Sequence, residues 1–140
     1  MEPNRRQFLT GACAFLGAGL GAALLTDSAD AATGIKRKKN GQVAVTVALI
    51  PGLQKITGVV NLGTVKGIPT AVVRTGTSTY AALNLRCPHA GVTVRDTGTQ
   101  WLCPAHGSQF ALDGAFISGP AGRALAPVRA RLRRGVLTVG

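Results

Sequence analysis

Alternation of apolar and polar residues with a period of two is the main pattern in the second and larger part of the chain. In Gln42–Val47 it places three valines on one face. Thr70–Val73 and Thr79–Leu83 have the same short, strand-forming character. No apolar spacing of 3.6 residues persists after Leu25. The pattern therefore predicts short strands and no long helix.

The end of the chain repeats this alternation with arginine at every second position. From Val128 to Arg133 the apolar residues alternate with arginines, and Arg134-Gly135 then precedes the apolar segment Val136–Val139. This arrangement predicts a C-terminal hairpin whose arginines face solvent. Glycine and proline interrupt the chain at short intervals between the candidate strands. The combination predicts an all-β fold, an antiparallel β sandwich or small barrel.

Residues 1–31 follow a different pattern. Phe8–Leu25 carries no charge, follows Arg5-Arg6, and precedes the small residues Ala29–Ala31. A basic start, an apolar middle and a small-residue site are typical of a signal peptide, and the paired arginines resemble a twin-arginine export signal. Two readings remain open, a cleaved signal and a retained helical anchor, because the uncharged run is just long enough to span a bilayer.

The next segment, residues 32–41, contains four consecutive cations in Lys36–Lys39. It is expected to be a flexible basic linker that leads into one domain over residues 42–140. The export signal predicts a periplasmic or other extracytoplasmic location, with membrane association if the N-terminal segment is retained. Because the twin-arginine route is known for carrying folded proteins, it favours a cofactor that is inserted before export.

Length, charge and composition exclude several classes of function. The 140 residues contain 16 Lys and Arg against 5 Asp and Glu, a net charge of +11, but only 4% aromatic residues. This length fits one domain and excludes an enzyme with separate cofactor and substrate domains. A nucleic-acid role is not expected, because few aromatic side chains are present to stack on bases.

Two short motifs contain all the histidine in the chain. They are Cys87-Pro88-His89 and Cys103-Pro104-Ala105-His106. One cysteine and one histidine from each motif predict a metal site between two loops, with the prolines stiffening each turn. From these residues alone three other readings stay open: a Cys87–Cys103 disulfide, a tetrahedral structural zinc site, and ordinary turn histidines.

The residues around these motifs resemble the signature of the Rieske iron–sulfur family. The shared segments are Cys87–Gly91, Cys103–Ser108, Phe110, Asp113-Gly114 and Ser118–Ala121. The resemblance implies one 2Fe–2S cluster, with Cys87 and Cys103 on the inner iron and His89 and His106 on the more exposed iron. It also implies a third loop over the cluster at Gly119-Pro120. Neutral imidazoles in place of two thiolates make such a centre easier to reduce than an all-cysteine cluster.

Three positions depart from the quinol-oxidising members of that family. Val92 and Ala105 stand where those proteins carry two cysteines that bridge the loops, and Phe110 stands where a tyrosine hydroxyl bonds a cluster-ligating sulfur. Ser108, a second donor in the family, is kept. Loss of one donor predicts a reduction potential below that of the quinol-oxidising subtype. Trp101 is expected to pack beneath the second loop.

These features predict one-electron transfer by an exported carrier, or by an electron-transfer subunit of a respiratory or periplasmic oxidoreductase, rather than a stand-alone enzyme. The basic charge predicts a redox protein partner with an acidic docking surface. The alternatives are a divergent iron–sulfur subunit of a bc complex and a zinc-stabilised binding module without redox activity. A ring-hydroxylating terminal oxygenase is excluded, because no histidine remains to bind its second iron.

Overall fold

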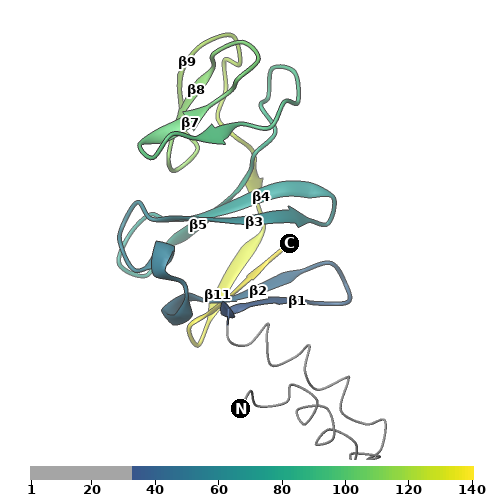
Figure 1. Cartoon of the computed structure of the whole chain (residues 1–140), viewed down its shortest axis with the longest axis vertical. Helices are drawn as coiled ribbons and strands as arrows, with labels where there is room; N and C mark the ends of the chain where they lie inside the picture. Colours follow the sequence, from purple (N-terminus) through teal and green to yellow (C-terminus); the bar gives the residue numbers. More distant parts are fainter. Residues whose placement is uncertain (1–32) are drawn as a thin grey trace, which may run out of the picture.

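Three antiparallel sheets of four strands each form the fold of residues 33–140, the part of the chain that the computed structural model describes. The sheets are stacked along the long axis of the domain (Figure 1). We call them the base sheet (order β1-β2-β12-β11), the middle sheet (β10-β5-β4-β3) and the distal sheet (β6-β7-β8-β9). The strands are β1 Ile35–Arg37, β2 Val43–Thr46, β3 Val59–Val65, β4 Ile68–Arg74, β5 Tyr80–Asn84, β6 Arg95–Asp96, β7 Gln100–Leu102, β8 Gln109–Ala111, β9 Phe116–Ser118, β10 Pro127–Val128, β11 Ala130–Arg133 and β12 Val136–Val139. The all-β prediction is confirmed for these residues.

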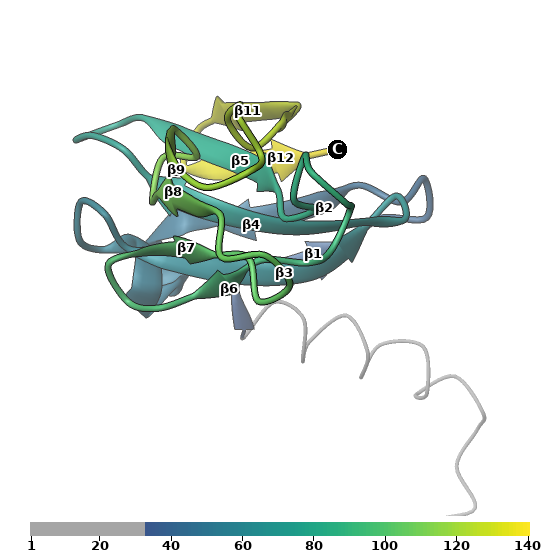
Figure 2. The same cartoon turned by 90° about the horizontal axis from the view of Figure 1, so that it is seen from above.

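The middle sheet is covered on both faces, which explains the almost continuous apolar character of β4. Val72 and Ala82 on one face pack into a core shared with the base sheet. Ala71, Val73 and Leu83, which alternate with them, pack into a second core under the distal sheet. Viewed from above, the distal strands lie over the middle sheet (Figure 2). A strand buried on both faces loses the simple alternation of a half-exposed strand.

The predicted strands at the two ends of the domain pair with each other. β2 pairs with β12, so that Val45 lies opposite Leu137, and both side chains are buried. The predicted C-terminal hairpin is present, with Arg133 opposite Val136. Between β2 and β3 lie two 3-10 helices, η1 Val47–Leu49 and η2 Pro51–Leu53. They end the expected strand one residue early, because the carbonyl of Val47 accepts from the N–H of Ile50 and so begins η1.

The expected flexible linker is wrong for Ile35–Arg37, which form β1 and pair with β2. Two interactions explain this order. Lys38 and Gln42 close the turn through a backbone hydrogen bond of 2.8 Å. The guanidinium of Arg37 donates to the carbonyl oxygens of Leu62 and Thr64, at 2.7 and 2.9 Å. Arg37 thus fastens β1 to β3 of the middle sheet. The residues around Arg37 give no sign of this long-range contact.

The expected signal or anchor over residues 1–31 lies outside the described residues. Among residues 33–140 there is no helix with the length and apolar character needed to cross a membrane.

Candidate metal centre

Two loops at the edge of the second core carry the cysteines and histidines. We call residues 87–92, between β5 and β6, the first loop, and residues 103–108, between β7 and β8, the second loop. Each loop closes in the same way. The N–H of Cys87 donates to the carbonyl of Val92, and the N–H of Cys103 donates to the carbonyl of Ser108, both at 2.8 Å. The sequence motifs therefore correspond to two matched turns.

A glycine four residues after each cysteine completes the match. The N–H groups of Gly91 and Gly107 donate back to the carbonyl oxygens of Cys87 and Cys103, at 2.8 and 3.0 Å. Both glycines have positive φ angles, 74° and 75°. A Cβ atom at either position would meet no atom within 4 Å, so the backbone conformation and not the available space selects glycine.

The four predicted ligands are brought together as two pairs. Cys87 and Cys103 are buried, free thiols, and their side chains are in hydrogen-bonding contact. His89 and His106 are exposed; their rings lie 4.7 Å apart between centroids, edge to face at 88°. The two cysteine side chains thus form a buried pair, and the two histidine side chains form an exposed pair. The disulfide reading is contradicted by the free thiols.

The second loop stabilises a thiolate at Cys103. Burial raises the pKa of the Cys103 thiol, but the backbone N–H groups of Ala105 and His106 and the Cys87 side chain together lower it further than burial raises it. The net result is a pKa below the ordinary value of a cysteine. Backbone donors directed at sulfur favour the anionic form that metals bind. The donor chemistry of this pocket therefore fits a metal–sulfur centre.

A third loop, residues 119–122, closes over the second. The N–H of Ala121 donates to the Oγ atom of fully buried Ser108 at 3.1 Å. Gly119, with φ of 103°, approaches so closely that a Cβ atom there would lie 2.5 Å from the Cα atom of Ser108. Only glycine permits this contact. The segment that the family resemblance implied as a third loop therefore packs against the second loop.

Two aromatic residues support the loops from within the core. Trp101 is 1% exposed and donates from its indole nitrogen to the carbonyl of Leu112 at 3.1 Å. Phe110 is fully buried and contacts the ring of Phe116, with centroids 6.2 Å apart. Trp101 is therefore a packing residue, as expected. Because Phe110 has no hydroxyl, it adds no donor to the site.

Sequence reasoning missed Arg123 as part of this region. Its Nη2 atom donates to the carbonyl of Pro88, in the first loop, at 3.3 Å. No local signal separates this arginine from the other cations of the chain, because the contact joins segments that are 35 residues apart.

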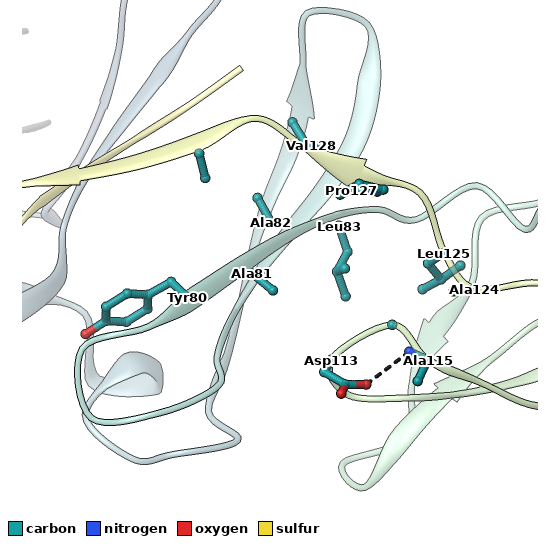
Figure 3. A pocket seen from close by; sticks show the side chains of 12 residues that line it. Tyr80, Ala81, Ala82, Leu83, Asp113, Ala115, Ala124, Leu125, Pro127 and Val128 are labelled. Atoms are coloured by element: carbon teal, nitrogen blue, oxygen red, sulfur yellow. Dashed lines mark hydrogen bonds between the residues drawn. The ribbon is translucent and has the colours of Figure 1, made fainter.

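A separate groove of about 410 Å³ lies on the flank of the domain, between β5, β10 and the turn of the β8–β9 hairpin (Figure 3). Its lining is mostly apolar and contains no cysteine or histidine. The acidic residue in the lining is Asp113, whose carboxylate accepts a hydrogen bond from the N–H of Ala115 at 3.0 Å. The groove is thus distinct from the two loops.

No group of three or more His, Cys, Asp or Glu side chains in residues 33–140 is arranged to hold a single metal ion. The positive finding is the paired arrangement, with two sulfurs and two imidazoles contributed equally by two loops. Soft thiolates together with imidazoles are donors suited to iron–sulfur centres and to zinc.

The fold and the paired loops define an all-β domain with a two-loop Cys/His centre. Residues 41–129 match the model of the Rieske [2Fe-2S] domain, and the chain belongs to this family. A Rieske [2Fe-2S] domain carries one 2Fe–2S cluster.

Two relatives with related sequences match about half of the chain. The chain is 42% identical over 71 residues to the cytochrome b6-f complex iron-sulfur subunit of Trichodesmium erythraeum, covering 48% of this chain and 40% of that protein. It is 43% identical over 68 residues to the same subunit of a Synechococcus species, covering 46% and 40%. The chain thus matches well under two thirds of the length of these relatives.

The fold is similar to that of naphthalene 1,2-dioxygenase with indole bound in its active site. The TM-score is 0.57 at 18% identity, and the likeness covers 80% of this chain and 28% of that one. At this identity the likeness concerns the fold.

Proposed function

We propose that the protein transfers single electrons through a 2Fe–2S cluster held by Cys87, Cys103, His89 and His106. The observation that carries this assignment is the pairing of like donors: the two buried thiols lie within hydrogen-bonding reach of each other, and the centroids of the two imidazole rings are 4.7 Å apart. Two iron atoms need two separate pairs of protein ligands, one on each iron. Two matched loops, each supplying one sulfur and one nitrogen, provide these pairs.

When bound, the cluster would accept one electron and later return it. The chain's own contribution is to stabilise the extra negative charge of the reduced state. The N–H groups of Ala105 and His106 point at the Cys103 sulfur, and hydrogen bonds to sulfur raise the potential. Burial of both cysteines keeps water from the sulfur side of the site, whereas the exposed histidines provide the edge through which an electron can leave.

A zinc-stabilised module remains the rival from another class, because zinc accepts the same donor types. The family membership favours iron, as does the separation of the four ligands into a buried thiol pair and an exposed imidazole pair. A tetrahedral zinc site would bring all four donor atoms within about 2.0 to 2.3 Å of one ion. The two readings differ in colour, since zinc has no visible absorption.

We infer that the redox partner presents an acidic surface to the histidine edge. Arg86, Arg95 and Arg123 are exposed near the two loops. In residues 33–140 the acidic residues are Asp96 and Asp113, and each carboxylate accepts a backbone N–H two residues ahead. With 14 Lys and Arg against these two carboxylates, residues 33–140 as a whole carry a positive charge that attracts anions.

We further propose that residues 1–31 act as a twin-arginine signal or anchor and that the domain at 42–140 functions on the extracytoplasmic side. The relatives named above are subunits of the cytochrome b6-f complex. A divergent subunit of a complex of the bc type is compatible with that likeness. The absence of cysteine at Val92 and Ala105, and of a hydroxyl at Phe110, favours a carrier or a subunit of a different oxidoreductase.

A redox titration of the purified full-length chain tests this function. Visible absorption and EPR are recorded while the potential is lowered stepwise. The proposal predicts a coloured oxidised protein and an EPR signal that appears on reduction with a one-electron slope. A colourless, EPR-silent protein that contains zinc would support the rival.

Replacing His106 with cysteine tests the ligand assignment. A third thiolate adds negative charge, so the potential should fall, or the cluster should fail to assemble. The same substitution at Ala105, which is exposed and not assigned as a ligand, is the matched control and should leave the spectrum unchanged. Wild-type spectra and potential in His106→Cys would contradict the assignment.

A further inference from the structure

The contact between Arg123 and Pro88 joins the segment after the third loop to the first loop. Arg123 donates from Nη2 to the Pro88 carbonyl at 3.3 Å. Pro88 lies directly between Cys87 and His89, two of the proposed ligands. The guanidinium is therefore bonded to the Pro88–His89 peptide, the second of the two peptide groups between the buried cysteine and the exposed histidine.

The bond from Arg123 to the Pro88 carbonyl also fixes the direction of the His89 N–H, because both groups belong to one planar peptide. The peptide bonds of residues 33–140 include no cis bond, and in a planar trans peptide the C=O and the following N–H point in opposite directions. By holding the Pro88 carbonyl outward, Arg123 directs the N–H of His89 away from itself. The hydrogen bond thus restrains the orientation of a backbone donor next to a ligand.

The second loop shows where the equivalent donor points. There the N–H of Ala105, two residues after Cys103, bonds to the Cys103 sulfur. His89 stands at the same place in the matched first loop, two residues after Cys87. Because the two turns share their closing bonds, we expect the His89 N–H to face the Cys87 sulfur.

We propose that Arg123 is a positioning residue that tunes the reduction potential, an inference that rests on the proposed function. It fixes the Pro88–His89 peptide so that its N–H faces the Cys87 sulfur, and it places a positive charge beside the first loop. Both effects stabilise the reduced, more negative state. The first loop has no disulfide to restrain it, because position 92 is valine and position 105 is alanine. The side-chain bond from Arg123, just after the third loop, supplies a restraint of another kind.

Arg86 provides a matched control for charge. It also donates from Nη2 to a backbone carbonyl, that of Gly67, at 3.0 Å, and it precedes Cys87 directly in the chain. The Arg86 guanidinium bonds to the turn between β3 and β4 and to none of the three loops at the metal centre. Removing Arg86 therefore deletes a nearby cation without releasing the Pro88–His89 peptide.

The experiment compares the potentials of the wild-type chain, Arg123→Ala, Arg123→Lys and Arg86→Ala by EPR-monitored titration. Arg123→Ala should lower the equilibrium constant for reduction about threefold to tenfold. This corresponds to a reduction potential lower by about 30 to 60 mV, at about 59 mV per tenfold for one electron. Arg86→Ala should change it less than about twofold. Arg123→Lys, which keeps a charged donor, should recover part of the loss.

The outcomes separate this inference from the function on which it rests. A wild-type chain without an iron–sulfur signal overturns the proposed function. A wild-type signal with equal shifts in Arg123→Ala and Arg86→Ala, or with no shift in either, overturns the role of Arg123 alone. If Arg123→Ala fails to retain the cluster, Arg123→Gln is titrated instead. A potential below wild type then supports the inference, and a wild-type potential overturns it.

Discussion

The N–H of Ala121 donates to the hydroxyl oxygen of Ser108 at 3.1 Å, and this bond ties the third loop to the second. Because Ser108 accepts from Ala121, its own hydroxyl hydrogen stays available as a donor. Ser108 is fully buried, and its carbonyl accepts from the N–H of Cys103 at 2.8 Å. One small side chain thus both fastens the covering loop and offers a donor to the proposed cluster.

Replacing Ser108 with alanine should lower both the potential and the stability of the loop. The substitution removes the proposed donor to the cluster, which disfavours the reduced state. It also leaves the half-buried N–H of Ala121 without its partner, at a cost of about 1 to 3 kcal/mol. EPR-monitored titration and thermal unfolding measure the two effects. An unchanged potential would show that the hydroxyl does not reach the cluster.

Gly119→Ala should be far more damaging than Gly122→Ala. The added Cβ at position 119 would lie 2.5 Å from the Ser108 Cα atom, whereas at position 122 it would meet nothing within 4 Å. Both glycines have positive φ, 103° and 67°, so alanine is strained at either position, and the close contact at position 119 adds to a φ that lies further from the left-handed region. We expect about 1 to 3 kcal/mol of additional destabilisation and faster loss of visible absorbance on storage. Equal behaviour of the two variants would exclude close packing of the third loop.

Phe110→Tyr should raise the reduction potential. Phe110 is fully buried beneath the second loop, two residues after Ser108, and the resemblance to quinol-oxidising Rieske proteins implies that a hydroxyl at this position bonds a ligating sulfur. An added hydrogen bond to sulfur favours the reduced state. Phe116→Tyr, on the exposed neighbouring ring, is the control and should leave the potential unchanged. A lower or unaltered potential in Phe110→Tyr would contradict the view that phenylalanine at this position lowers the potential by removing a hydrogen bond to sulfur.

The basic surface should make electron exchange depend on salt according to the charge of the oxidant. For the reduced protein, anionic ferricyanide should react about tenfold more slowly when ionic strength is raised from low values to about 0.3 M. Cationic tris(phenanthroline)cobalt(III) should react faster under the same change, because repulsion is screened. Stopped-flow absorbance gives both rates. Rates that are insensitive to salt for both oxidants would remove the basis for an acidic partner surface.

Local pattern predicted the features that depend on neighbouring residues. The alternation around Val43 and Val45 located β2, and the arginine alternation located the C-terminal hairpin, because period two is a property of the strand itself. The two Cys/His motifs predicted matched loops, since each loop closes on hydrogen bonds within six residues.

Features that depend on distant contacts were missed or mistaken. Ile35–Arg37 reads as part of a charged linker, and its order comes from Arg37 bonding to carbonyl oxygens of β3. Likewise, the bond from Arg123 to Pro88 joins segments that no sequence pattern connects. Long-range hydrogen bonds to backbone carbonyls leave no residue signature, because any residue supplies the acceptor.

The content of iron and acid-labile sulfide in the purified full-length protein tests the central claim most directly. Anaerobic purification followed by elemental and sulfide assay should give about two iron and two labile sulfide per chain, with zinc at trace level. About one zinc per chain without labile sulfide would contradict the assignment of Cys87, Cys103, His89 and His106 to an iron–sulfur cluster.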